Sequence, residues 1–252
     1  GLRGWKPPPT RRPDLGNASG GSHMNDDTNE RPFVVLLGGE IADLAELGAV
    51  RRDATVVAAD SGLHLAAPLG LNVATVVGDM DSVNPTALAA VEALGTEVLR
   101  FSPDKDASDA ELALRHAAAL GATSLVVIAG RSNRLDHELG NLAVLFLPEL
   151  RRIHVELRVA GARVFRIDAH EQPDTRLQFS CKTGDIVGLM PFGGDAHGVT
   201  TSGLQWALSN DTLAVNSSRG ISNRATRDDV VVTLQHGRLL VTVTDGATHA
   251  TA

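Results

Sequence analysis

The sequence predicts an α/β protein in which an amino-terminal parallel-sheet α/β domain is followed by an all-β sandwich domain. Two observations lead to this prediction. Between residues 33 and 150, short apolar runs alternate with longer stretches whose apolar positions recur every three or four residues. After about residue 150 that helical spacing ends, and short strand-like runs separated by turn residues remain. We expect the two domains to span residues 31–160 and 161–252.

The first half contains alternating strand and helix patterns. The predicted strands are Phe33–Leu37, Thr55–Ala59, Val73–Val77, Glu97–Phe101 and Leu125–Ala129, and the predicted helices are Pro85–Leu94, Asp109–Leu120 and Leu135–Leu147. Ser108 and Glu111 have the spacing of a capping box at the start of the second of these helices. Strands that alternate with helices in this way predict a parallel sheet covered on both faces.

The second half reads as strands without long helices. The predicted strands are Val155–Val159, Arg163–Asp168, Leu177–Ser180, Asp185–Met190, Thr212–Asn216, Val230–Leu234 and Leu239–Val243. Several short strands at this spacing are typical of a sandwich or a jelly roll.

Residues 1–30 differ from the rest of the chain. They are rich in Pro, Gly, Asn, Arg and Asp, and they contain Gly21-Ser22-His23-Met24, which resembles residual vector sequence. We interpret this segment as vector-derived or disordered and leave it out of the fold prediction.

The composition argues against several classes of partner. The formal charge is −7, with no basic stripe for nucleic acid or an anionic membrane. No run of about 18 apolar residues and no secretion signal is found, so we expect a cytoplasmic protein. The single cysteine, Cys181, excludes an internal disulfide and a cysteine-rich metal site.

Aspartates follow three successive predicted strands. Asp79 and Asp81 follow the third strand, and in an extended segment two residues at this spacing point to the same side. Asp104, Asp106 and Asp109 follow the fourth strand, and Asp136 follows the fifth. Because parallel sheets bind ligands at the carboxyl ends of their strands, these acids predict a magnesium site that serves a nucleotide. The alternative is that each aspartate only caps a helix or turns the chain.

The usual phosphate-binding loops are absent from the sequence. Neither a Walker A pattern nor a Gly-x-Gly-x-x-Gly turn occurs. Gly38-Gly39 could admit a phosphate, although a plain turn is favoured for this pair.

Several segments together resemble the signature segments of the thiamin diphosphokinase (thiamin pyrophosphokinase) family. In chain order these segments are Ala59-Asp60-Ser61-Gly62, Gly78-Asp79-Met80-Asp81-Ser82, Asp104 to Glu111, Arg134-Leu135-Asp136-His137, Ser202-Gly203-Leu204-Gln205-Trp206-Ala207-Leu208 and Ser222-Asn223. The resemblance covers about residues 33–244. Each segment alone is weakly specific, whereas the ordered set is strongly specific.

The resemblance implies a Rossmann-like amino-terminal domain for ATP and a carboxy-terminal β-sandwich for thiamin and dimerisation. It implies a homodimer with active sites shared between subunits. Roles in binding Mg²⁺ would fall to Asp79, Asp81, Asp106, Asp109 and Asp136, of which Asp79, Asp81 and Asp136 would also act in catalysis. ATP would contact Asp60, Arg134 and His137, and thiamin would contact Ser202, Trp206, Ser222 and Asn223.

Some of these residues also have plainer interpretations. Trp206 is either a face on which thiamin stacks or a core aromatic, and Ser222-Asn223 either contact thiamin or form a turn. His137 either binds phosphate or satisfies a helix end. The family pattern has glycines where this chain has Ser132-Asn133 and Ser61, which affects the expected pose of ATP.

The implied reaction is transfer of a diphosphate group from ATP to the hydroxyl of thiamin, with AMP as the other product. Asp79 or Asp81 would accept the hydroxyl proton. Two alternatives are a diphosphokinase for another hydroxymethyl heterocycle, such as a pterin, and a non-catalytic sensor of nucleotide or thiamin diphosphate. Trp206 argues against the first alternative, and the large set of carboxylates argues against the second.

Overall fold

The computed structural model of this chain describes residues 30–41, 43–159, 161–170 and 174–249. Apart from Glu30, the segment that we interpret as vector-derived or disordered lies outside the described residues. Within the described part, no helix has the length and apolar character needed to span a bilayer.

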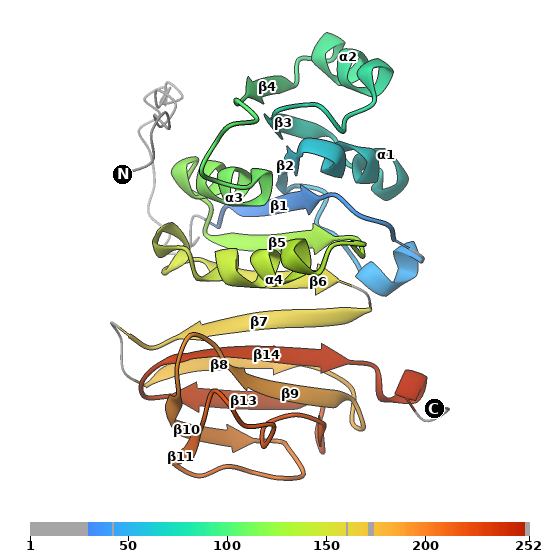
Figure 1. The fold of residues 1–252 in the computed structure, drawn as a ribbon. Helices are drawn as coiled ribbons and strands as arrows, with labels where there is room; N and C mark the ends of the chain where they lie inside the picture. The colour runs from blue at the N-terminus through green and yellow to red at the C-terminus, as the bar shows by residue number, and fades with distance from the viewer. Residues whose placement is uncertain (1–29, 42, 160, 171–173, 250–252) are drawn as a thin grey trace, which may run out of the picture.

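The amino-terminal half forms a parallel sheet, as predicted (Figure 1). The described strands run side by side in the order β4-β3-β2-β1-β5-β6. Their bounds are β1 Pro32–Leu37, β2 Thr55–Ala59, β3 Val73–Gly78, β4 Glu97–Arg100, β5 Ser124–Ala129 and β6 His154–Val159. All neighbours in this series are parallel, so their carboxyl ends lie along one edge.

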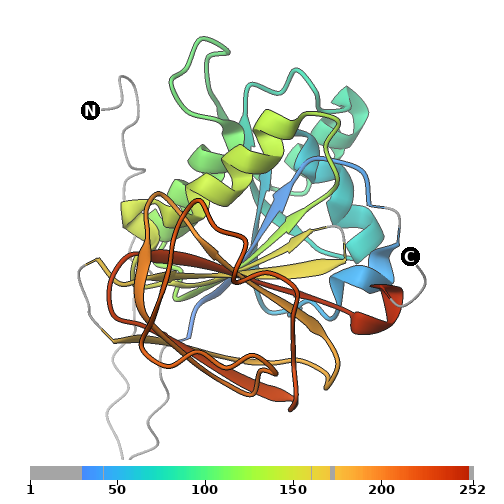
Figure 2. The same ribbon diagram turned by 60° about the horizontal axis from the view of Figure 1, so that its bottom comes forward.

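Helices cover both faces of this sheet, because alternate residues of each strand point to opposite sides (Figure 2). Val35 and Val57 join one core cluster with helix α3 (Asp109–Ala119) and the segment after α4 (Leu135–Ala143). Val34 and Val56 join the other, with the 3-10 helix Asp60–Leu65, α1 (Ala66–Leu69) and α2 (Pro85–Ala93). The near-continuous burial of these strands explains why they read as unbroken apolar runs.

The carboxy-terminal half is a β-sandwich of antiparallel strands. One layer contains β12 (Asn223–Arg224), β9 (Ile186–Pro191), β14 (Arg238–Thr244) and β7 (Ala162–Asp168). The other contains β11 (Asp211–Leu213), β10 (Ala196–Ser202), β13 (Asp229–Leu234) and β8 (Thr175–Ser180). Side chains from the inner faces, including Ile167, Leu189 and Val232, form one buried cluster.

The two halves share one continuous sheet. Strand β7 pairs antiparallel with β6 of the parallel region, with Leu157 opposite Val164, and pairs with β14 on its other side. Within the described residues the result is a single ten-stranded sheet. The domain boundary near residue 160 therefore lies inside a bonded ladder, and it remains our interpretation of the sequence.

Several details of the prediction are wrong. Val155–Val159 was expected among the strands of the second half, but it is β6 of the parallel sheet. The short strand β12 was not predicted. Strand β10 was not predicted, because His, Gly and Thr interrupt its apolar pattern and Gly198 has a φ of 68°. The strand expected over Thr212–Asn216 ends at Leu213. The helix expected over Leu135–Leu147 ends at Ala143 and continues as a 3-10 turn before Pro148, which cannot supply a backbone donor.

Candidate active site

A cavity of about 460 Å³ lies at the carboxyl ends of the parallel strands. It is bordered by the segments that follow β1, β2, β3, β4 and β5, so the sheet topology brings these distant segments together. Its lining includes Gly38, Gly39, Asp60, Ser61, Ser82, Lys105, Asp109, Ser132, Asp136 and His137.

Three carboxylates converge beside this cavity. One oxygen each of Asp60, Asp79 and Asp81 lies within 4.8 Å of the others. The predicted convergence of Asp79 and Asp81 is confirmed, but the extended geometry given for it is wrong, because Met80 has a φ of 68°. The chain turns there instead, and the amide of Asp81 donates to Asp79 Oδ1 at 3.2 Å.

Asp109 reaches the same region from the first turn of α3. Ser108 caps this helix by accepting a hydrogen bond from the amide of Glu111 at 3.2 Å, as predicted, but the carboxylate of Glu111 pairs with Arg115 and does not complete the capping box. A Cβ at Gly78 would lie 3.1 Å from Asp60 Cβ and 3.2 Å from Asp109 Oδ1. Gly78 therefore permits the close approach of the two acids, and its φ of 155° also favours glycine.

Lys105 is a site residue that the sequence analysis missed. Its Nζ lies 3.2 Å from Asp79 Oδ2 and 3.0 Å from Asp109 Oδ1, and its side chain is 15% exposed. The ammonium group therefore bridges two acids from different elements, because Asp79 follows β3 and Asp109 lies in α3. Lys105 stands between Asp104 and Asp106 in the sequence, and that alternation of charge was the available signal.

The acids differ in their electrostatic environment. Burial, together with the charges of Asp109, Asp79 and Asp81, raises the pKa of Asp60 above its usual value. Burial likewise raises the pKa of Asp109, although Lys105 opposes this shift. Burial also acts on Asp79, but the amide of Asp81 and the ammonium of Lys105 outweigh it and lower its pKa.

The cluster fits a hard divalent cation. Asp60 Oδ1 is buried and has no hydrogen-bond partner within the described residues. A buried carboxylate oxygen in this state costs free energy that a bound cation would recover. Three oxygens at this spacing match the carboxylate ligands of magnesium.

The remaining predicted residues of this half lie in different surroundings. Asp136 and His137 line the cavity at the start of α4, and both are exposed. Arg134 Nη2 pairs with Asp136 Oδ2 at 2.7 Å on the surface, an interaction worth little stability and readily exchanged for phosphate. Asp106 is exposed and is not among the residues that line the cavity, so its metal role stays a prediction.

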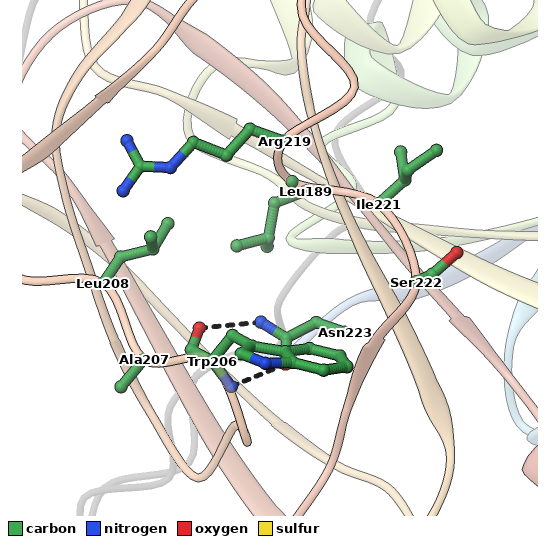
Figure 3. A pocket seen from close by; sticks show the side chains of 9 residues that line it. Leu189, Trp206, Ala207, Leu208, Arg219, Ile221, Ser222 and Asn223 are labelled. Carbon is green, nitrogen blue, oxygen red and sulfur yellow. Dashed lines mark hydrogen bonds between the residues drawn. The ribbon is translucent and has the colours of Figure 1, made fainter.

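A second pocket, of about 510 Å³, lies in the sandwich (Figure 3). Its lining includes Leu189, Trp206, Leu208, Arg219, Ile221, Ser222 and Asn223. Trp206 is 57% exposed, so the alternative that it is a core aromatic is wrong. Its indole instead forms one wall of the pocket.

Asn223 fixes the backbone of Trp206. Its buried side chain accepts from the amide of Trp206 at 3.1 Å and donates to the carbonyl of Trp206 at 2.8 Å. Ser222 lines the pocket in a left-handed conformation with a φ of 60°. Ser202 does not line it, and its hydroxyl accepts from Arg227 Nη2 at 2.5 Å.

Two family models match the chain. Residues 49–157 match the model described as thiamin pyrophosphokinase, catalytic domain. Residues 168–239 match the model described as thiamin pyrophosphokinase, vitamin B1 binding domain. The first covers the parallel strands that carry the acids, and the second covers the pocket of Trp206.

Curated relatives carry the same name. The chain is 32% identical to thiamine pyrophosphokinase 1 of Arabidopsis thaliana over 162 residues, which is 62% of this chain and 59% of the relative. It is 22% identical to thiamine pyrophosphokinase of Bacillus subtilis over 170 residues, covering 66% of this chain and 76% of the relative. The match thus spans less than two thirds of the length of the Arabidopsis protein.

Solved structures share the fold. A crystal structure of thiamine pyrophosphokinase from Bacillus subtilis superposes with a TM-score of 0.73 at 20% identity, covering 85% of this chain and 99% of that one. Thiamin pyrophosphokinase from Candida albicans superposes with a TM-score of 0.66 at 13% identity, covering 86% and 89%.

Proposed function

Because the chain belongs to the thiamin pyrophosphokinase family, we propose that it transfers a diphosphate group from ATP to the hydroxyl of thiamin. The observation that carries this proposal is the joint presence of the carboxylate cluster at the strand ends and the pocket walled by Trp206. At the first site, a nucleoside triphosphate needs cations that neutralise its phosphate charge. An aromatic wall suits the cationic thiazolium ring of thiamin at the second.

For the metal ligands we propose Asp60, Asp79 and Asp81, with Asp109 close by. Support comes from the spacing of the first three carboxylates and from the unpartnered oxygen of Asp60. From the sequence, Asp60 was expected to contact ATP, and Asp106 and Asp136 were expected to bind the metal. Asp136 borders the cavity, so it remains a candidate ligand for a magnesium ion that is also bound to the phosphates of ATP. Bound Mg²⁺ would neutralise charge that spreads over the phosphate oxygens.

The chain's own residues would position the phosphates. Lys105 borders the cavity with its ammonium group and can turn from Asp79 toward a phosphate when cations neutralise the acids. Arg134 and His137 stand at the amino-terminal end of α4, where an anion is favoured. Ser61 and Ser132 border the same cavity, in place of the glycines of the family pattern.

Thiamin would attack the β-phosphorus of ATP through its hydroxyl oxygen. A new oxygen–phosphorus bond forms, the bond to the α-phosphate bridging oxygen breaks, and AMP leaves. The hydroxyl proton passes to a carboxylate. The lowered pKa of Asp79 makes it a weak base, which disfavours it as the acceptor.

We also propose a homodimer with shared sites. The two pockets of one chain have no lining residue in common. Trp206 and Ile221 expose apolar surface at the second pocket, which a partner subunit would cover.

Product analysis tests the proposed reaction. The protein is incubated with ATP, Mg²⁺ and a panel of hydroxymethyl heterocycles that includes thiamin and a pterin. The products are identified by mass spectrometry. We expect thiamin consumption to be matched by AMP, and chelation by EDTA to stop it. Formation of ADP would contradict diphosphate transfer, and turnover of the pterin alone would contradict the assignment of substrate.

A further inference from the structure

Three histidines from separate segments lie together at one end of the sandwich. His170 follows β7, His197 belongs to β10, and His236 lies in the turn between β13 and β14. The backbones of His197 and His236 bond to each other, with N–O distances of 2.9 and 3.2 Å. The amide of Ala169 donates to the carbonyl of Gly237 at 2.9 Å. These backbone hydrogen bonds therefore fix the positions of the backbone atoms from which the three side chains extend.

The rings of His170 and His236 are close enough to share one ion, and the ring of His197 must turn to join them. The ring centroids of His170 and His236 are 5.2 Å apart, and those of His197 and His236 are 6.3 Å apart. With metal–nitrogen bonds of about 2.0 Å, two imidazoles at a tetrahedral angle place their centroids about 5.2 Å apart. The first pair has this separation, whereas the second requires the exposed His197 ring to turn about its side-chain torsions.

Hydrogen bonds orient two of the rings. His170 Nδ1 lies 3.0 Å from Asp168 Oδ1, and the other oxygen of Asp168 accepts from Arg238 Nε at 3.1 Å. A ring whose Nδ1–H donates to a carboxylate presents an unprotonated Nε2, which is the form that binds metal. His197 Nδ1 lies 3.2 Å from the hydroxyl of Thr212, and this contact orients the ring.

The side chains of all three histidines are exposed, so an ion can reach them from solvent. Within the described part of the chain, their Nε2 atoms make no hydrogen bond to another residue. None of them lines the cavity of the acids or the pocket of Trp206. The nearby Arg238 does not oppose a cation strongly, because Asp168 pairs with it.

We propose that His170, His197 and His236 form a binding site for one divalent transition-metal ion of the zinc class. Neutral imidazoles favour Zn²⁺, Cu²⁺, Ni²⁺ or Co²⁺ over Mg²⁺, which prefers oxygen ligands. Three nitrogens leave a fourth position for water. Asp168 and Thr212 act as positioning residues, because they contact the ligand rings and not the ion.

Cobalt titration tests this proposal on the full chain, with Mg²⁺ in excess to occupy the carboxylate cluster. We expect one Co²⁺ per chain, with the intense visible absorption of tetrahedral coordination. Zn²⁺ should displace it and raise the melting temperature. His236→Ala should weaken binding at least tenfold and remove the intense bands, whereas His154→Ala, an exposed histidine outside the cluster, should change neither.

Two further variants separate ligands from positioning residues. Asp168→Asn should weaken Zn²⁺ about tenfold to a hundredfold. Because this change also breaks the pair with Arg238, Thr212→Val serves as a milder variant, and it should weaken Zn²⁺ severalfold without altering the melting temperature of the metal-free protein. Equal binding by the unsubstituted chain and His236→Ala, or only the weak absorption of six-coordinate cobalt, would overturn the proposal.

Discussion

Asp60 has an unfavourable electrostatic environment for an acid at the end of a strand. It has a left-handed φ of 44°, one buried carboxylate oxygen and several neighbouring acids. Its folded pKa lies above the unfolded value, so its ionised form costs folding free energy at neutral pH. This cost is what a bound cation would remove.

We therefore expect Asp60→Asn to leave the melting temperature of the metal-free protein unchanged or higher, because the substitution removes a repelled charge. Diphosphate transfer should fall by about 100-fold or more, since charge stabilisation at the phosphates is lost. The rise in melting temperature caused by Mg²⁺ should also disappear. Calorimetry with and without Mg²⁺ measures both temperatures.

The matched control is Asp104→Asn, an exposed acid that follows the same edge of the sheet and does not line the cavity. It should keep both activity and the response to Mg²⁺. If Asp60→Asn instead unfolds readily and still binds Mg²⁺, Asp60 is a structural residue.

Asn223 has a comparable influence on the second pocket, because it holds the backbone of Trp206 through both ends of its amide. Asn223→Ala should cost about 1 kcal/mol in stability, since it leaves partly buried backbone groups unpaired. It should also raise KM for thiamin more than KM for ATP. Urea unfolding and steady-state kinetics measure these effects.

Ser222→Gly provides the comparison for this prediction. Glycine adopts the left-handed conformation of residue 222 without strain, so stability should be kept or improved. Unchanged KM for thiamin would assign Ser222 to the turn, and an increase would assign its hydroxyl to the substrate.

At the scale of elements, strand ends determine the site and strand interiors determine the fold. The apolar runs that end at Leu37, Ala59 and Ala129 were predictable, because burial on both faces leaves no alternating pattern to misread. Since parallel strands end at one edge, the clustering of Asp79, Asp81 and Asp109 was also predictable. The turn at Met80 and the bridge through Lys105 were not, because both depend on tertiary contacts.

The sandwich was harder to predict than the parallel sheet. Its short strands expose one face, so polar residues interrupt their pattern, and β10 was missed for this reason. The pocket of Trp206 was found only through the resemblance of its segment to a known family. Ser202 does not line that pocket, and its hydroxyl accepts from Arg227, so its contact with thiamin stays a prediction.

Helix α3 packs on the sheet through a buried histidine. His116 lies 3.4 Å from the hydroxyl of Thr75 in β3, and burial lowers its pKa below the usual 6.5. The unfolded chain therefore binds a proton at a pH where the folded protein does not. Stability from this residue is present above pH 6.5 and is lost as the pH falls toward the folded pKa.

His116→Leu should consequently flatten the loss of stability between about pH 7 and pH 5. Urea unfolding at several pH values measures the slope. His154→Leu, at an exposed position on β6, should retain the slope of the unsubstituted chain. An unchanged slope in His116→Leu would show that the acid sensitivity arises elsewhere.

At the scale of the whole molecule, the proposed shared site predicts complementation between two inactive variants. Asp81→Asn is mixed, unfolded and refolded with the double variant Trp206→Ala and Asn223→Ala. If each site uses Asp81 of one subunit and Trp206 of the other, a mixed dimer has one intact site. Random pairing makes about half of the dimers mixed, so roughly a quarter of the original activity should return.

Native mass spectrometry provides the necessary check by confirming that mixed dimers form. If they form and no activity returns, each site is built within one chain. The proposed chemistry would then stand without the shared arrangement.

The ladder between β6 and β7 has a mechanical consequence. Four residue pairs, from Glu156–Phe165 to Val159–Ala162, tie the parallel strands to the sandwich. A hinge rotation of one half against the other would have to break these bonds and bend a sheet that is buried on both faces. The acids and the indole of one chain are thus held at a fixed separation. Any closure around substrates must come from loops or, in the proposed homodimer, from sliding between subunits.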